Sequence, residues 1–162
     1  MAKNSHIEWT HHTFNPWWGC KKVSPACDNC YAEAMMDHRY GKVEWGPHGE
    51  RKRTSTDNWN NPRKWNANAR AFKEEHGHRP RVFCASLADV FDNQIDPTWR
   101  EDLFGLTQKC KRLDWSILTK RPQNIMKILP SDWGDGYQNV WLGVTAEDQP
   151  RYSSRDCAKA LR

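Results

Sequence analysis

The sequence has no long hydrophobic run, and its overall hydropathy is low. No stretch approaches the ~18 consecutive apolar residues of a membrane-spanning helix. Residues 1–10 also lack the apolar segment of a secretory signal peptide. The mean hydropathy is −1.00, and hydrophobic residues make up only 37% of the 162 residues. We therefore expect no membrane contact and a cytoplasmic protein.

Acidic residues are fewer than basic ones, and the imbalance is local. The chain has 25 Lys and Arg against 20 Asp and Glu, a net charge of +5. Residues 42–81 hold ten basic and five acidic side chains, which accounts for the whole excess. Trp45, Trp59 and Trp65 lie between these charges. Cations with interleaved aromatic rings are typical of surfaces that bind phosphates and stack on bases, although a charge run is more often only a solvated surface. We expect weak nucleic-acid contact through residues 42–81.

Three of the six cysteines are clustered. Cys20, Cys27 and Cys30 lie within eleven residues, in the pattern C-x6-C-x2-C. In a reducing compartment such a cluster favours a metal site or a catalytic role over disulfides. Thiolates prefer iron–sulfur clusters, zinc or copper(I). The other cysteines lie in apolar or helical patterns and are expected to fill the core: Cys84, Cys110 and Cys157.

Three cysteine ligands suit two kinds of metal site. A [4Fe-4S] cluster held by three cysteines keeps one iron open for a cofactor or substrate. A structural zinc site normally has four protein ligands, so a histidine would have to complete a Cys3His site in a structural or nucleic-acid-binding module. The candidates for that ligand are His11, His12 and His38. The spacing of the cysteines does not choose between the two metals.

Strand and helix patterns alternate along the chain. Buried-strand patterns are predicted over 81–86, 115–119 and 140–145, after a first short strand over 7–10. Helices are predicted after the cysteines, with Asp28 as N-cap, and then from Asn61-Pro62 to Gly77, from Asp96-Pro97, from Pro122 and from Gln149-Pro150. This alternation predicts an α/β fold with parallel strands, a partial (β/α) barrel of about four strands. We expect one domain over residues 1–162, with a basic loop-helix insertion at about 42–80.

Polar side chains follow the predicted strands. Asp89 and Lys120 come shortly after the strands over 81–86 and 115–119. In parallel α/β folds the ligand site lies outside the carboxyl ends of the strands. The cysteine loop also follows a strand, so we expect it to face one pocket together with Asp89 and Lys120. The alternative is that these polar residues are ordinary helix caps.

Four separated segments carry a family resemblance. In order, they are IEWTHHTFNPWWGCKKVSPACDNCYAEAM, VFCASLADVF, ILTKRP and NVWLGVTAEDQ. They resemble a phage and prophage three-cysteine-motif family of uncharacterised function, the gp-thirty-seven/gp-sixty-eight family. That family is similar to radical S-adenosylmethionine enzymes, which carry a three-cysteine loop after the first strand of a partial (β/α) barrel.

The resemblance implies a cofactor and a missing part of the barrel. It implies a [4Fe-4S] cluster on Cys20, Cys27 and Cys30, with S-adenosylmethionine bound at the open iron. Asp89 or Glu147 would then hold the amino group of that cofactor, and Lys120 a carboxylate or phosphate. Family members continue beyond the fourth strand, so this chain resembles an N-terminal half, which a C-terminal half or a partner protein would complete.

Overall fold

The structure is a computed structural model that describes residues 5–145. Its centre is a four-stranded parallel sheet in the order β1 (His12–Phe14), β4 (Arg81–Cys84), β5 (Asp114–Thr119) and β6 (Val140–Val144). A second, two-stranded antiparallel sheet pairs β2 (Trp17–Trp18) with β3 (Lys52–Arg53). The predicted α/β fold is confirmed. The four parallel strands form an open sheet, with no closed barrel among the described residues.

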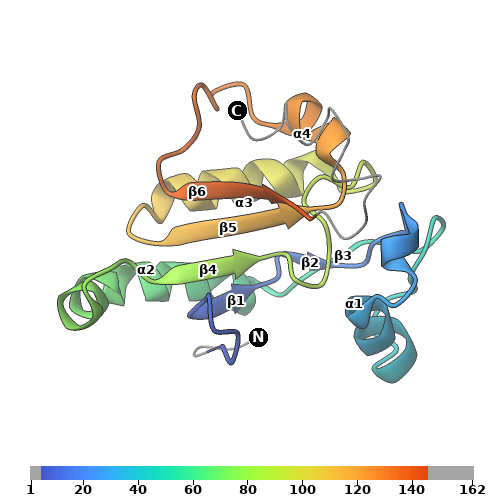
Figure 1. Cartoon of the computed structure of the whole chain (residues 1–162), viewed down its shortest axis with the longest axis horizontal. Coiled ribbons are helices and arrows are strands. Elements are labelled where there is room, and N and C mark those ends of the chain that lie inside the picture. The colour runs from blue at the N-terminus through green and yellow to red at the C-terminus, as the bar shows by residue number, and fades with distance from the viewer. Residues whose placement is uncertain (1–4, 146–162) are drawn as a thin grey trace.

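The helices connect these strands in the predicted alternation. The main ones are α2 (Thr56–His76), α3 (Pro97–Lys109) and α4 (Pro122–Ile128). Three short elements follow the first cysteine: η1 (Pro25–Cys27), α1 (Tyr31–Glu33) and η2 (Ala34–Arg39). Figure 1 shows α2 and α3 behind the sheet, whereas α1 lies on the side toward which the arrowheads of β4 and β5 point. No helix among residues 5–145 is long and apolar enough to cross a membrane.

One face of the sheet is buried more completely than the other. Side chains alternate between the two faces of a strand. In β5, Trp115 and Ile117 are completely buried, whereas Ser116 and Leu118 are only half-buried. The buried side joins the core residues of α2 and α3, with Phe14 in edge contact with the rings of Trp59 and Trp115. The opposite face is the open side of the sheet.

Helix α2 begins earlier than the sequence predicts. It starts at Thr56, with Ser55 as N-cap, so Pro62 lies inside the helix. The predicted start at Asn61-Pro62 is wrong because the first turn is held by tertiary contacts: the Asn58 side chain donates to the backbone oxygen of Asn15 at 2.8 Å. The C-terminus is as predicted, with Gly77 in the left-handed conformation at φ 78°.

Two further boundaries near the N-terminus differ from prediction. Residues 7–10 form a turn, closed by the Thr10 N–H donating to the Ile7 carbonyl at 3.1 Å, and the first strand begins only at His12. The helix after the cysteines has Cys30 at its N-cap position, whereas the predicted cap Asp28 follows the η1 turn. The helix predicted from Gln149-Pro150 lies outside the described residues.

Candidate functional site at the carboxyl edge of the sheet

A cavity of about 350 Å³ opens where β4 and β5 end. The cysteine loop forms one wall, and the segments that follow the two strands form the other. Its lining includes all three clustered cysteines and both polar residues expected there: Cys20, Cys27, Cys30, Asp89 and Lys120. The structure therefore brings the predicted residues around one cavity. Glu147 lies outside the described residues.

Backbone geometry places Cys20 at this cavity. Gly19 has a φ of +99°, a conformation that favours glycine, and a Cβ there would lie 2.9 Å from the Glu50 carbonyl oxygen. Gly19 also forms a parallel bridge with Ala88, which ties the start of the cysteine loop to the segment after β4. A side chain at position 19 would therefore displace the loop that carries Cys20.

The second and third cysteines lie on a tight turn. The Cys27 N–H donates to the Ser24 carbonyl at 2.9 Å, and Cys30 follows as the N-cap of α1. The ammonium of Lys120 donates to the Ala26 carbonyl at 3.2 Å. This contact links the cysteine turn to the end of β5, so Lys120 lies between the two walls of the cavity.

Arg121 is the closest charged partner of Cys20. Both terminal nitrogens of its guanidinium, Nη1 and Nη2, lie 3.3 Å from the Cys20 sulfur. Nη1 also donates to Asp89 at 2.8 Å, and Nη2 to the Lys21 carbonyl at 2.9 Å. Burial raises the pKa of the Cys20 thiol to about 11, a shift that Arg121 opposes. Burial alone would lower the pKa of Arg121, but Asp89 and Cys20 raise it above its ordinary value.

Asp89 holds Arg121 in place. Its Oδ1 accepts from the Thr119 hydroxyl at 2.8 Å and from the Phe91 N–H at 2.9 Å. Its Oδ2 accepts from the Lys120 N–H at 3.1 Å and from Arg121 at 2.8 Å. Since both carboxylate oxygens are engaged, Asp89 in this structure orients the arginine. Its role as a ligand of a cofactor amino group stays a prediction.

A second buried carboxylate extends the network to the basic segment. Arg51 donates to Asp92 through Nε at 2.9 Å and Nη2 at 2.8 Å, and the two side chains are only 3% and 0% exposed. Asp92 also lies 3.8 Å from Arg121. Arg51 belongs to the segment predicted to contact nucleic acid, but its side chain is buried in this ion pair. The place of Arg121 directly after a predicted strand favoured the pocket, but the sequence did not predict its contact with Cys20. The roles of Asp92 and Arg51 were missed.

Two further features mark the cavity. Ala85, directly after β4, is the one described non-glycine residue with a positive φ, at 61°. Such backbone conformations cluster at functional sites. The Tyr31 hydroxyl donates to the Ser86 carbonyl across the cavity, which connects α1 to the same segment.

The three histidines proposed as a fourth zinc ligand do not line this cavity. His12 pairs in register with Val82 in the sheet and stacks on Trp65 at 4.4 Å, and the His11 Nδ1 accepts from the Arg81 N–H at 2.9 Å. His38 is an exposed residue of η2. Among the residues that the structure describes, a Cys3His site at the cavity therefore has no histidine in place.

The donor set nevertheless fits a thiolate-ligated centre. The five described cysteines are free thiols, and three of them line the cavity. Within residues 5–145, no three His, Cys, Asp or Glu side chains lie close enough together to hold one metal ion. A centre with several metal atoms has its ligand sulfurs farther apart than a single ion does. The residues present therefore have the ligand chemistry of an iron–sulfur cluster. The three sulfurs would move closer together when the cluster binds.

The two other described cysteines confirm their predicted place in the core. Cys84 and Cys110 are 0% and 1% exposed and belong to the main hydrophobic cluster. Burial raises the pKa of both thiols. Cys157 lies outside the described residues.

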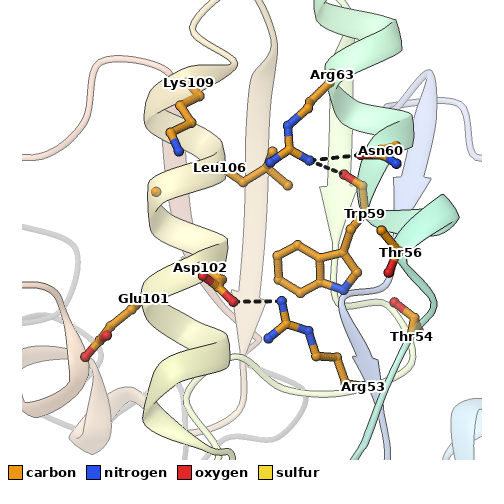
Figure 2. Close-up of a pocket in the computed structure, with 11 residues that line it drawn as sticks. Arg53, Thr54, Thr56, Trp59, Asn60, Arg63, Glu101, Asp102, Leu106 and Lys109 are labelled. Carbon is orange, nitrogen blue, oxygen red and sulfur yellow. Dashed lines mark hydrogen bonds and ion pairs between the residues drawn. The ribbon is translucent and has the colours of Figure 1, made fainter.

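A second hollow, of about 450 Å³, lies between α2 and α3. Figure 2 shows Arg53 between Asp102 and the ring of Trp59: its guanidinium lies 2.7 Å from the Asp102 carboxylate and 4.3 Å from the ring centroid. Arg63 donates to the Trp59 carbonyl and to Asn60, both at 3.2 Å. No cysteine lines this groove, and its two arginines already have acceptors. The cavity at the sheet edge is therefore the stronger candidate for chemistry.

Two of the three tryptophans in the basic segment are buried in the core. Trp59 and Trp65 are only 7% and 8% exposed and belong to the main hydrophobic cluster. They anchor α2 on the sheet, and Arg53 lies over the ring of Trp59. Trp45 is half-buried and lines the cysteine cavity.

Comparison with known proteins gives a family but no activity. No curated protein and no solved structure matches this chain. Residues 4–161 match the family described as "Protein of unknown function (DUF5131)". Because this match spans nearly the whole sequence, the chain belongs to the DUF5131 family.

Proposed function

We propose that this chain binds a [4Fe-4S] cluster through Cys20, Cys27 and Cys30 and acts as a radical S-adenosylmethionine-like enzyme. The observation that carries the proposal is the convergence of these three thiols on one cavity at the carboxyl edge of a parallel sheet. This edge is where α/β folds place their ligands. When bound, such a cluster supplies an electron to a cofactor at its open iron.

The residues of this chain would position the cofactor and exclude water. The cavity walls include small and apolar side chains, among them Ala88 and Leu118, with Phe83 at one side. Lys120 and Arg121 bring positive charge to the same space, which suits the carboxylate of S-adenosylmethionine or a phosphate. The substrate would enter from the open side of the cavity.

Metal analysis after anaerobic reconstitution tests this proposal. The unchanged chain, supplied with iron, sulfide and zinc together, is expected to retain iron and sulfide. Added S-adenosylmethionine should alter the electron paramagnetic resonance spectrum of the reduced cluster, because one iron lacks a protein ligand. Stoichiometric zinc without iron would reject the cluster and favour the zinc-binding module. A spectrum indifferent to S-adenosylmethionine would keep the cluster and reject the radical chemistry.

The proposal includes a partner for the sheet. In the described structure, β1 pairs only with β4 and β6 only with β5, so both form edges of the open sheet. All-parallel sheets are normally covered on both faces. We propose that the open face of the sheet is covered by a C-terminal half or a partner protein of the phage-type family that the sequence resembles.

Weak nucleic-acid contact is a second candidate function. The observation that favours it is a set of four cations on α2: Arg63, Lys64, Arg70 and Lys73. All four are exposed, and Lys73 lies in the last turn of the helix. With Trp59 and Trp65 buried, this contact would be made to phosphates alone and would carry no sequence preference.

A further inference from the structure

We propose that Arg121 is the positioning residue for Cys20, and that its hydrogen bonds to the sulfur raise the reduction potential of the centre bound there. The inference rests on the proposed function, because it concerns the same metal site. It adds a residue that the three-cysteine pattern does not contain. Arg121 is not itself a ligand; it acts through Cys20.

The geometry of Arg121 leaves it one orientation. Arg121 is only 2% exposed, and its backbone N–H donates to the Thr119 hydroxyl oxygen at 2.9 Å. The same hydroxyl donates to Asp89, which in turn accepts from the Arg121 guanidinium. The main chain and the side chain of Arg121 are therefore fixed by one ring of contacts. The guanidinium edge that remains faces the Cys20 sulfur with both terminal nitrogens.

Four charged side chains form a buried network beside Cys20. Asp89 and Asp92 carry two negative charges, and Arg51 and Arg121 carry two positive charges in direct contact with them. A thiolate at Cys20 adds a negative charge directly against a guanidinium. A guanidinium that donates to an ionised acceptor makes hydrogen bonds about twice as strong as neutral ones. Arg121 therefore offers a cation and two donors to the Cys20 sulfur once a bound centre holds it as a thiolate.

Hydrogen bonds to ligand sulfurs alter the reduction potential of an iron–sulfur centre. Reduction adds an electron, so a cation and two N–H donors at one sulfur stabilise the reduced state. Asp89 and Asp92 act in the opposite sense, because negative charge near the sulfur favours the oxidised state. Arg121 and Asp89 are therefore expected to shift the potential in opposite directions.

Potentiometric titration of the reconstituted chain tests this sign. Arg121→Gln should lower the potential relative to the unchanged chain, and Arg121→Lys, which keeps the charge but not the paired donors, should fall between the two. Asp89→Asn should raise it. Arg53→Gln removes an arginine from an ion pair with Asp102 in the α2–α3 groove and should leave the reduction potential unchanged.

The outcomes separate this inference from the proposed function. If the unchanged chain does not retain iron and sulfide, the proposed function is overturned, and so is the proposed effect of Arg121 on the reduction potential. Full iron content with an unaltered reduction potential in Arg121→Lys overturns only the proposed effect of Arg121 on the potential. Shifts of the same sign in the Arg121 and Asp89 variants would indicate loosened packing and would also overturn it.

Nuclear magnetic resonance on the metal-free chain tests the contact itself. Cys20→Ala should alter the side-chain nitrogen and proton shifts of Arg121, whereas Cys110→Ala should not. Arg121 shifts that stay the same in Cys20→Ala would overturn the positioning role even if the chain binds iron.

Discussion

Arg121 and Cys20 are 101 positions apart in the chain, yet both terminal guanidinium nitrogens lie 3.3 Å from the sulfur. The contact joins the loop that leads into α1 to the segment that follows β5. This side-chain contact and the Gly19–Ala88 bridge together attach the cysteine loop to the sheet. The candidate site therefore depends on charges buried beneath the cysteines.

Removing Asp92 should destabilise the fold strongly. Asp92→Ala leaves Arg51 buried without its carboxylate, and breaking a buried pair in this way costs about 3–5 kcal/mol. Asp102→Ala breaks the partly exposed pair with Arg53, whose side chains are 34% and 55% exposed, so the loss should be at most about 1 kcal/mol. Denaturant unfolding of both variants measures the difference, and equal losses would contradict the buried network.

The stability of the chain should fall as the pH drops below the ordinary histidine range. His11 accepts a hydrogen bond from the Arg81 N–H, and burial, together with His78, Arg81 and His76, lowers its pKa below 6.5. The folded state therefore favours neutral His11, and the stability present above pH 6.5 is lost as the unfolded state takes up a proton.

The measurement is the free energy of unfolding between about pH 7.5 and about pH 5.5. His11→Asn should lose less stability over this interval than the unchanged chain. His38→Asn, at an exposed position, serves as the control and should follow the unchanged chain. An identical pH dependence in all three proteins would show that His11 contributes nothing.

Regular periodicity and capping signals made the second half of the chain predictable. Asp96-Pro97 opens α3 as expected, because the Asp96 carboxylate accepts from the Thr98 N–H at 2.9 Å. The strands ending at Thr119 and Val144 follow from short buried runs. The start of α2 was not predictable in this way, because Pro62 is a strong local signal and the Asn58 contact to Asn15 spans 43 positions.

Part of the candidate site was also predictable, from residue types and their places in the sequence. Cys20, Cys27 and Cys30 are recognisable by residue type and spacing, and Asp89 and Lys120 by their place after strands. Arg51 looks like one cation in a charge run, because its burial depends on Asp92, 41 positions away. Trp59 and Trp65 looked like a binding surface because a tryptophan in a basic stretch gives no sign of which way it faces.

Nucleic-acid binding, if carried by residues 42–81, should weaken steeply with salt. Each phosphate contact contributes a slope of about −0.9 in the logarithm of affinity against the logarithm of salt concentration for duplex DNA. Replacing Lys64 and Lys73 with Glu should weaken binding and flatten this slope. The same charge change at Lys111 and Lys127, exposed positions outside the stretch, should have less effect. Fluorescence anisotropy measures both quantities, and equal effects of the two pairs would remove the assignment to this segment.

The open side of the sheet should cause self-association when nothing covers it. Trp141, on the edge strand β6, is 67% exposed and pairs in register with the half-buried Ser116. Exposed apolar surface beside an unpaired strand edge favours association. Sedimentation velocity should show larger species at higher concentration, and fewer of them in Trp141→Lys. Met126→Lys changes another exposed apolar residue, 73% exposed on α4, and should have little effect; a monomer at every concentration would contradict this prediction.

The most direct test of the central claim is the iron and sulfide content of single cysteine variants after anaerobic reconstitution. Alanine at Cys20, Cys27 or Cys30 should abolish retention of the cluster, because each thiol at the cavity supplies one ligand. Alanine at Cys110 should leave iron and sulfide unchanged, at a stability loss of about 1 kcal/mol for the small cavity it creates. Full iron and sulfide in any variant of the three loop cysteines, or their loss in Cys110→Ala, would contradict the assignment of the cluster to this cavity.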